Sequence, residues 1–474
     1  MNHKIVTAAL ALSPFVSYAA DAKRPNIIFI LTDDHRMDAL GYAGNPIVRT
    51  PALDQLARQG VYFQNAMATT PISAASRASI LTGLYERTHG YTFQQGPLKK
   101  PYMETAYPVV LRQNGYYTGF FGKLGVDYKD ADKLFDQADI YDRAERKKDR
   151  TGYFYKKIDK DTVHLTRYTG YEAQNFLRNI PGDKPFCLSL SFSAPHAQDQ
   201  AKEQFFWQPK SDTLYSKVRI PDPVLKEDKY FNALPKEVRE GFNRTRWYYS
   251  YDTPEKYQEH YKGYYRMITE IDDEIRDLRK LLEQKGLAEN TVIIFMGDNG
   301  LFKGERQLAG KWLMYDLSIR VPMIIFDPRE AKHKDVKDMV LNIDVPKTIL
   351  SLAGVKVPEI YQGESLIPYT KGLKVPKVRK TILFEHLWNF KPIPSSEAVR
   401  TEEWKYIRYR TIQAPEELYH LKTDPLEENN LAGNPKYKKL IEKLRNECTI
   451  QADKYKKAKL CSDTIDASQV KVNF

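Results

Sequence analysis

Apolar strands that run directly into polar residues constrain the fold of this chain more than any other feature. Asn26 to Leu31 is a short continuous apolar run, and Thr32-Asp33-Asp34-His35 follows it at once. Further strands are expected at residues 186–192, 291–296 and 321–326, with amphipathic helices between them, of which the longest is expected at about 261–285. This alternation predicts an α/β protein with a large mixed sheet sandwiched by helices. Ligands of such sheets bind at the carboxyl ends of the strands, so the polar residues there are candidates for a site.

Two stretches interrupt the alternation, and the pattern changes again towards the end of the chain. Residues 130–167 and 201–253 are rich in Lys, Asp, Tyr and Trp without a clear period, which is typical of long surface loops that could wall a substrate cleft. From about Lys371, short strand-like segments at 381–385, 398–400 and 405–409 precede an amphipathic helix from 435 to about 454. We therefore expect a catalytic domain over residues 21–370 and a smaller C-terminal α+β subdomain, with a short antiparallel sheet, over residues 371–474.

Residues 1–20 predict a secretory signal peptide. Lys4 is followed by an apolar run from Ile5 to Phe15 and by small residues at 17–20 that suit cleavage. The run is too short to cross a bilayer, and no later stretch reaches about 18 apolar residues. No cysteine follows the run, so a lipid anchor has no candidate. We expect export across the inner membrane, a periplasmic or extracellular location and no membrane anchor.

Two acidic pairs, Asp33-Asp34 and Asp298-Asn299, each follow an apolar strand and lie some 265 residues apart. Adjacent carboxylates repel unless a cation lies between them, and ligand sets made of oxygen suit a hard ion such as calcium or magnesium. Either pair by itself is more often a helix cap or a solvated turn. Their joint occurrence at strand ends favours a metal site.

The segment from Thr70 to Gly83, TPISAASRASILTG, resembles the signature of the type I sulfatases. In that signature Cys or Ser is followed by x, Pro or Ala, Ser and Arg, and then by a Leu-Thr-Gly helix. Other landmarks of the family follow in its order: Thr32-Asp33-Asp34, Gly122-Lys123, Ala194-Pro195-His196, Gly297-Asp298-Asn299-Gly300, Gly310-Lys311-Trp312 and, near the end, Glu417-Leu418-Tyr419-His420-Leu421 and Asp424-Pro425. Each motif alone is weak, but together they cover nearly the whole mature chain. The resemblance implies an alkaline-phosphatase-like fold and hydrolysis of sulfate esters.

The resemblance implies that a maturase oxidises Ser73 to formylglycine (3-oxoalanine), whose hydrated aldehyde is the nucleophile. An unmodified serine would form a sulfate ester that hydrolyses slowly, whereas a geminal diol has a second hydroxyl that expels sulfate as the aldehyde re-forms. Arg77, one helical turn further on, would hold the hydrated aldehyde. Lys123 and Lys311 would neutralise the sulfate oxygens as the bond breaks.

The resemblance also implies one metal ion, expected to be calcium, with ligands from Asp33, Asp34, Asp298, Asn299 and Ser73. His196 would bind sulfate or protonate the leaving oxygen. Without these motifs, the three basic residues named above would be interpreted as solvated cations and His196 as a structural residue.

One position departs from the family pattern. Many sulfatases carry a histidine two residues beyond the lysine that aligns with Lys123, and this chain has Gly125 there. That histidine is assigned to deprotonating the hydrated aldehyde, so His89, His35 or a bound water are the candidates for this step. Ser73 is also open to two interpretations: a serine-type sulfatase that needs an anaerobic radical maturase, or an engineered Cys-to-Ser change that leaves the protein inert.

A formal net charge of +12 fits either plain solubility or attraction to a polyanion. No nucleic-acid-binding motif is recognised, so we expect no nucleic-acid partner, and sulfated glycan is the polyanion that suits an exported protein. Aromatic rings stack on sugar faces and cations meet sulfates, which favours an exo-acting glycan O-sulfatase with a sulfated saccharide substrate. Candidate residues for sugar recognition are His35, His89, Glu385, His386 and Arg400, together with Trp207 and Trp388. Those from the C-terminal part could equally pack the two domains together, and mucin O-glycan, heparan, chondroitin and marine galactans all stay open as substrates.

Two other functions compete with this interpretation. A phosphomonoester or diester hydrolase of the alkaline-phosphatase superfamily would need a second metal site richer in His and Asp, and the chain has nine histidines. A catalytically inert protein could bind sulfated glycan through the same pocket. The three cysteines exclude a disulfide scaffold: Cys448 and Cys461 could pair, and Cys187 lies in an apolar run typical of a buried thiol. Nothing in the sequence indicates an oligomeric state.

Overall fold

The structure, a computed structural model, describes residues 23–93, 96–144, 152–199, 201–330, 333–375 and 379–460. The signal peptide expected at residues 1–20 lies outside these ranges, and so does Cys461, the possible partner of the buried Cys448. Both expectations therefore stay predictions. In the part of the chain that is described, no helix has both the length and the apolar character needed to cross a bilayer.

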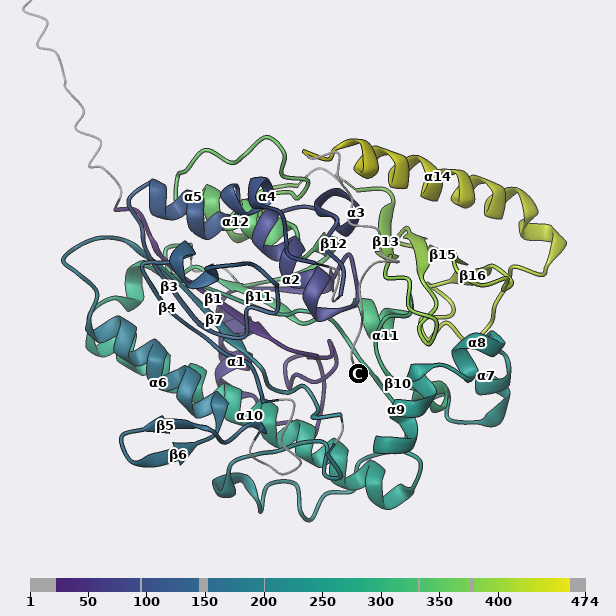
Figure 1. Ribbon diagram of the computed structural model, residues 1–474, viewed down its shortest axis with the longest axis horizontal. Coiled ribbons are helices and arrows are strands. Elements are labelled where there is room, and N and C mark those ends of the chain that lie inside the picture. Colours follow the sequence, from purple (N-terminus) through teal and green to yellow (C-terminus); the bar gives the residue numbers. More distant parts are fainter. Residues whose placement is uncertain are drawn as a thin grey trace, which may run out of the picture.

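An eight-stranded sheet forms the centre of the main body (Figure 1). In order across the sheet, its strands are β12 (Lys334–Leu341), β2 (Val61–Met67), β11 (Met323–Phe326), β8 (Thr291–Gly297), β1 (Asn26–Thr32), β7 (Phe186–Phe192), β3 (Tyr117–Gly122) and β4 (Gln137–Ile140). Strand β11 runs antiparallel to its neighbours β8 and β2, whereas the other pairings are parallel. The predicted α/β fold with a mixed sheet is confirmed.

Helices cover both faces of this sheet, as the two layers in Figure 1 show. Ile28 and Ile30 of β1 belong to the core shared with α1 (Pro51–Gln59), α6 (Leu165–Arg178) and α10 (Pro254–Gln284). Ile27 and Phe29 face the opposite core, which is shared with α2 (Ser73–Thr82), α4 (Lys100–Glu104), α5 (Tyr107–Gln113) and α12 (Asp344–Leu352). A strand buried on both faces is apolar throughout, which is why β1 is visible in the sequence.

The C-terminal part forms a second, four-stranded antiparallel sheet. Its strands, in order, are β13 (Ile382–His386), β14 (Ser396–Arg400), β15 (Trp404–Tyr409) and β16 (Glu417–His420), and α14 (Lys438–Lys457) packs against them. Leu341 of β12, Leu383 of β13 and Leu444 of α14 share one core, so this sheet packs on the main body. The predicted C-terminal sheet is confirmed, and the domain boundary at residue 370 stays a prediction.

The two stretches expected to be loops contain short elements of their own. Residues 130–167 form η1 (Ala131–Leu134), β4, β5 (Lys156–Ile158), β6 (Asp161–Val163) and the start of α6, and residues 201–253 form η3 (Pro209–Ser211), α7 (Asp228–Asn232), α8 (Lys236–Arg239) and α9 (Phe242–Ser250). Elements this short carry too few turns to show a period. Helix α10 also begins earlier than expected, because the Thr253 side chain caps it by accepting a hydrogen bond from the Lys256 N–H.

Shorter elements connect these layers. They are α3 (Glu86–His89), η4 (Ala288–Asn290), β9 (Phe302–Lys303), η5 (Glu305–Gln307), β10 (Ala309–Gly310), α11 (Asp316–Ile319), α13 (Ile367–Thr370) and η6 (Pro435–Tyr437). Strand β10 matters for the site because it ends directly before Lys311.

Candidate active site

The carboxyl ends of β1 and β8 bring the two acidic pairs together. The strands are parallel neighbours in which Thr32 lies beside Gly297, so Asp33 and Asp298 leave the same edge of the sheet. The Asp34 N–H donates to Asp298 Oδ1 at 3.0 Å, and Asn299 Nδ2 donates to Asp34 Oδ1 at 2.7 Å. All four side chains are buried. Residues far apart in the sequence thus form one acidic cluster.

Ser73 is the first residue of α2, and its side chain reaches this cluster. Its Oγ donates to Asp33 Oδ1 at 2.7 Å and lies 3.2 Å from Asn299 Oδ1. Lys311 Nζ donates to the same Oγ at 3.0 Å and forms an ion pair with Asp34. The hydroxyl group therefore lies between the acidic cluster and a buried lysine.

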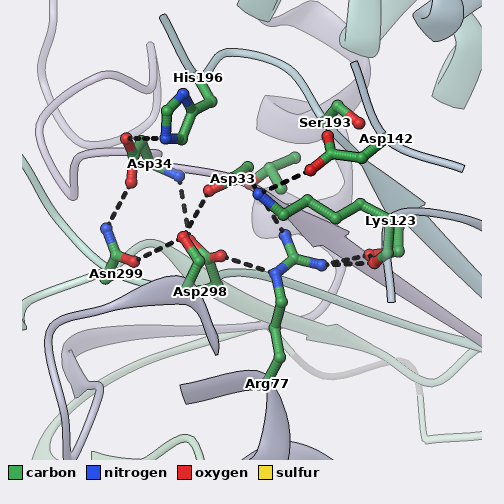
Figure 2. A network of polar contacts seen from close by, with 12 residues as sticks. Asp33, Asp34, Arg77, Lys123, Asp142, Ser193, His196, Asp298 and Asn299 are labelled. Carbon is green, nitrogen blue, oxygen red and sulfur yellow. Dashed lines mark hydrogen bonds and ion pairs between the residues drawn. The ribbon is translucent and has the colours of Figure 1, made fainter. Parts of the chain in front are cut away.

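Two further cations close round the acidic residues. Arg77, one turn after Ser73 on α2, donates from Nε to Asp298 Oδ2 at 2.9 Å. Lys123, directly after β3, has its Nζ 2.5 Å from Asp33 Oδ2. Figure 2 shows both side chains pointing toward the acidic residues, while Asn299 and His196 lie beside Asp34. The structure thus brings together the residues predicted as nucleophile, metal ligands and sulfate-binding groups, whereas the two candidates for a base lie elsewhere.

Asp34 has a strained backbone that α10 holds in place. Its φ of 60° lies in the left-handed region, which residues other than glycine adopt at a cost. The Tyr264 hydroxyl of α10 donates to the Asp34 carbonyl oxygen and accepts from the Arg36 N–H, each at 2.9 Å. Sequence reasoning missed Tyr264, because a tyrosine in an amphipathic helix otherwise indicates core packing.

The pKa values of Asp33 and Asp298 are shifted in opposite directions by their surroundings. Burial opposes ionisation of Asp33, but Lys123 leads the charges that hold the pKa of Asp33 well below its ordinary value. Burial, followed by the negative charge of Asp33, raises the pKa of Asp298 to about 6. The cluster is therefore short of positive charge at Asp298, even with three basic side chains beside it.

His196 faces Asp34 in an arrangement that fits a bound cation. Its Nδ1 lies 2.5 Å from the Ala197 carbonyl oxygen and donates to it, so Nε2 of the neutral ring is an acceptor. Burial, followed by Arg143 and Lys311, lowers the pKa of His196 well below its ordinary value and keeps the ring neutral. Nε2 lies 3.4 Å from Asp34 Oδ2, which accepts no hydrogen bond from the described residues.

Two acceptors that face each other at this distance are stabilised by a cation between or beside them. Asp33, Asp34 and His196 each offer a ligand atom within 4.8 Å of the others, and they are the one such group of three in the described part of the chain. With Asp298 and Asn299 next to them, these residues could hold a divalent metal ion.

His35 and His89, the candidates for a base, lie in internal hydrogen bonds instead of against Ser73. Both ring nitrogens of each histidine have partners: Thr32 Oγ1 at 3.2 Å and the Ala39 carbonyl oxygen at 2.9 Å for His35, and Ser79 Oγ and the Tyr91 N–H, each at 3.1 Å, for His89. Burial lowers their pKa values to about 4 and about 3. The structure thus places both rings as buried structural groups.

Three further candidates for sugar recognition, Glu385, His386 and Arg400, are buried where the C-terminal sheet meets the main body. Glu385 accepts two hydrogen bonds from Arg87, each of 2.8 Å, and Arg400 lies 3.3 Å from Asp316. His386 is fully buried, and burial lowers its pKa to about 3. These contacts join the two parts of the molecule, and a role in sugar recognition stays a prediction.

The packing explains why this chain has Gly125 at the position where many sulfatases carry a histidine. Its φ is +68°, and a Cβ there would lie 2.6 Å from Arg77 Cδ. The stem of Arg77 thus takes up the space that a side chain at this position would need. Any residue with a side chain would strain the backbone and displace Arg77.

Asp142 belongs to the same site, although sequence reasoning did not select it. Its Oδ2 lies 3.2 Å from Lys123 Nζ, so this lysine bridges Asp142 and Asp33 (Figure 2). Asp142 follows β4 by two residues, so the argument from strand ends applies to it as well. Strand β4 has the sequence Gln-Ala-Asp-Ile and shows no apolar run, which is why that signal was lost.

The chain is similar to known sulfatases along most of its length. The family model described as "Sulfatase" matches residues 25–355, and one described as "N-sulphoglucosamine sulphohydrolase, C-terminal" matches residues 304–454. An N-acetylglucosamine-6-O-sulfatase from Bacteroides thetaiotaomicron is 28% identical to this chain, and the match covers 91% of this chain and 87% of the relative.

Two solved structures share this fold. A protein in complex with its substrate D-glucosamine-2-N,6-O-disulfate has a TM-score of 0.77 at 25% identity, and the match covers 92% of this chain and 99% of that one. A phosphonate monoester hydrolase from Silicibacter pomeroyi has a TM-score of 0.74 at 22% identity, covering 91% and 96%, a likeness that shows the fold alone. The family match decides between the two activities: this chain belongs to the sulfatase family and is a sulfuric ester hydrolase.

Proposed function

We propose that this chain hydrolyses sulfate esters at the ends of carbohydrate chains, with a formylglycine made from Ser73 and one calcium ion. The observation that carries the proposal is the position of Ser73, whose Oγ lies 2.7 Å from Asp33 Oδ1 and 3.0 Å from Lys311 Nζ. A nucleophile derived from this residue would thus have an acidic cluster on one side and a lysine on the other.

The chemistry of the available donors fits calcium. Asp33, Asp34 and Asp298 offer carboxylate oxygens and Asn299 offers an amide oxygen, which are the ligands that hard cations prefer. The acceptor atoms of Asp34 and His196, which face each other at 3.4 Å, support a cation at this place. Calcium would supply positive charge beside the sulfate group.

Each residue round Ser73 has a distinct task in this proposal. A hydrated aldehyde at position 73 supplies two hydroxyl groups on one carbon, one for attack on sulfur and one for release of sulfate. Asp33 Oδ1, which already accepts a hydrogen bond from the Ser73 hydroxyl, orients the attacking group. Lys123 and Lys311 neutralise the sulfate oxygens, since their ammonium groups lie at the two edges of the acidic cluster.

Arg77 and His196 complete the site. Arg77 bonds to Asp298 and, through Nη1, to the Lys123 carbonyl oxygen at 2.7 Å, so it fixes the turn that carries Lys123. His196, which is held neutral with Nε2 unprotonated, is suited to take up a proton and return it to the leaving oxygen. Since Gly125 has no side chain, Asp33, whose Oδ1 accepts a hydrogen bond from the Ser73 hydroxyl at 2.7 Å, is the carboxylate placed to take the proton from the hydrated aldehyde.

Two observations support a sulfated saccharide as the substrate. The net charge of +12 favours anionic partners. The relative named above is an N-acetylglucosamine-6-O-sulfatase, and the similar structure holds a disulfated glucosamine.

Mass spectrometry of the tryptic peptide of residues 59–77, from protein made in a host with an anaerobic maturase, tests the modification. Conversion of the Ser73 alcohol to an aldehyde lowers the mass by about 2 Da. Fragment ions must place the loss at Ser73 and not at Ser76, which lies in the same peptide. A peptide that carries only unmodified serine would overturn the formylglycine part of the proposal.

The reaction is tested with a panel of defined sulfated saccharides, with calcium and with a chelator. We expect calcium-dependent release of sulfate, and a melting temperature that rises with calcium concentration because the ion binds the folded state. Turnover of phosphodiesters with no release of sulfate from any saccharide would contradict the proposal.

A further inference from the structure

Arg246 lies at the edge of the candidate active site and has no part in the reaction described above. It belongs to α9, and 6% of its surface is exposed. Its guanidinium group pairs with Asp199, three residues beyond His196. Within the described ranges, Asp199 is the one acidic residue that forms an ion pair with Arg246. A buried guanidinium with a single carboxylate partner carries a desolvation cost that a second anion would offset.

Helix α9 is fastened to the segment that carries Lys311. Asn243 Nδ2 donates to the carbonyl oxygens of Ala309 at 2.9 Å and of Lys311 at 3.0 Å. The stem of Arg246 lies against Gly310, where an added Cβ would come within 3.2 Å of Arg246 Cδ. Arg246 therefore lies over the residue next to Lys311, whose Nζ is hydrogen-bonded to Ser73.

Trp312 lies beneath the Arg246 guanidinium, whose central carbon is 5.4 Å from the ring centroid. The tryptophan is 5% exposed, and its Nε1 has no hydrogen-bond partner among the described residues. Its φ of 81° is also unusual for a residue with a side chain. Buried donors without acceptors and strained backbones are concentrated at functional sites. Trp312 is thus an unsatisfied donor next to the arginine.

Asp199 leaves this region accessible to solvent. Its side chain is 27% exposed, so solvent reaches the ion pair with Arg246. Asp142 and, less strongly, Asp199 favour the charged form of Arg143, whose Nη2 lies 3.5 Å from His196 Nε2. On the side of His196 that leads toward α9, Arg246 is thus paired with Asp199 and Arg143 with Asp142, which lies 3.6 Å from it.

We propose that Arg246 binds a second anionic group of the substrate, a sulfate or a carboxylate on the same saccharide as the ester that is cleaved. Guanidinium groups bind such oxyanions through paired N–H groups, and the Trp312 N–H offers a third donor. The ester that is cleaved would lie at Ser73 and Lys311. The second anion would lie beside Arg246 and Trp312. This inference rests on the proposed function, because it concerns the substrate of the same site.

The test compares Arg246→Gln and Arg246→Lys with Arg244→Gln as a matched control. Arg244 lies on the same helix, but its guanidinium packs on the rings of Phe231 and Trp247, at 4.3 and 3.9 Å. The substrates are one monosulfated saccharide, the same saccharide with a second sulfate, and the same saccharide linked to a uronic acid. Melting temperatures of all variants check that they fold.

We expect Arg246→Gln to lower kcat/KM for the dianionic substrates by about 10- to 100-fold and for the monosulfated one by less than about 3-fold. Arg246→Lys keeps the charge without the paired donors and should give an intermediate loss. Arg244→Gln should leave all three substrates unchanged. The two dianionic substrates show whether the second group is a sulfate or a carboxylate.

An equal loss on all three substrates would overturn the inference, since Arg246 would then support the site without binding a second anion. Equal kcat/KM of the unaltered enzyme on monosulfated and dianionic saccharides would overturn it too. Calorimetric binding of the same saccharides to the chain with unconverted Ser73 gives a readout that needs no turnover. If no saccharide is hydrolysed but Arg246→Gln selectively weakens dianion binding, the proposed function fails and the subsite stands.

Discussion

Two buried clusters of charged side chains in this molecule differ in how their charges are balanced. The first is the candidate active site at the carboxyl ends of β1 and β8. The second, the interface cluster, consists of Asp316, Arg400, Lys405 and Glu427 and lies where the C-terminal sheet meets the main body. Lys405 Nζ lies 2.5 Å from both Asp316 Oδ1 and Glu427 Oε1, and Arg400 lies 3.3 Å from Asp316.

Asp316 of the interface cluster and Asp298 of the active site have pKa values shifted in opposite directions, although each cluster also holds a carboxyl group shifted the other way. In the interface cluster, Arg400 and Lys405 outweigh burial and hold the pKa of Asp316 well below its ordinary value, although burial raises that of Glu427. In the active site, burial and Asp33 raise the pKa of Asp298 to about 6. Buried charges that neutralise one another hold the fold together, whereas carboxylates that face one another cost stability and suit a ligand.

The largest expected effect separates catalysis from stability. Ser73→Ala should lower kcat/KM on a sulfated saccharide by at least about 10⁴-fold, because the nucleophile is gone. Its free energy of unfolding should change by less than about 1 kcal/mol, since the substitution removes one small hydroxyl group. Urea denaturation and initial rates measure the two quantities. Residual activity above about 1% of the unaltered enzyme would assign the nucleophile to another residue.

The reverse pattern is expected for Lys405→Met. Removing the shared cation leaves Asp316 and Glu427 buried without it, so the free energy of unfolding should fall by about 3–5 kcal/mol. Activity per folded molecule should stay the same, because Lys405 does not contact the site. Lys443→Met, at an exposed position of α14, is the control and should change neither quantity. A stable Lys405→Met variant with poor activity would show that the two clusters are coupled.

A third pair of variants tests whether a buried carboxyl group stabilises or destabilises the fold in each cluster. With a chelator at pH 7.5, Asp298→Asn should raise the free energy of unfolding by up to about 3 kcal/mol, because a carboxyl group whose pKa is raised to about 6 destabilises the folded state above that pH. The gain should disappear as the pH falls to about 4, where this carboxyl group is protonated. Asp316→Asn should instead lower the free energy of unfolding by about 3 kcal/mol.

Calcium provides the control for this pair. The unaltered protein should gain stability from the ion, whereas Asp298→Asn should gain less because it loses a ligand. A loss of stability in Asp298→Asn with the chelator present would mean that Asp298 is held by its hydrogen bonds to Arg77 and Asp34 more strongly than it is repelled by Asp33.

The sequence predicted the active site far better than the interface cluster, and the reason is physical. Asp33 and Asp298 each follow a buried apolar strand directly, so their convergence is a consequence of parallel pairing. The members of the interface cluster come from α11, β14, β15 and the loop after β16, and only tertiary packing brings them together. Lys405 lies between Trp404 and Tyr406 on β15, a position that predicts a solvated lysine, yet it is fully buried.

Strands with charged residues were missed for a related reason. Strand β12 has the sequence Lys-Asp-Val-Lys-Asp-Met-Val-Leu and lies at the edge of the sheet, so part of it faces solvent and the apolar run is short. Strand β4, at the opposite edge, was not predicted for the same reason, so Asp142 was not recognised as a residue at a strand end. The four central strands β11, β8, β1 and β7 were predicted because burial on both faces makes them apolar. Strands β2 and β3, which lie next to the edge strands, were not predicted either.

The smallest expected effect concerns His386, at the end of β13 beside the interface. It is fully buried, neither ring nitrogen has a hydrogen-bond partner among the described residues, and burial lowers its pKa to about 3. The unfolded chain, with an ordinary pKa near 6.5, therefore binds a proton below that pH that the folded chain excludes. The contribution of His386 is neutral above pH 6.5, and stability is lost as the pH falls, by about 2 kcal/mol at pH 5.

His386→Leu should remove this loss. The difference in unfolding free energy between pH 7.5 and pH 5, measured with urea, should shrink by about 2 kcal/mol relative to the unaltered protein. His333→Leu, at a side chain that is 43% exposed, should leave the difference unchanged. If His386→Leu has no effect on the pH dependence, protons reach the ring in the folded state. The interface between the two sheets would then be open to water, although the paired charges of the interface cluster indicate a closed one.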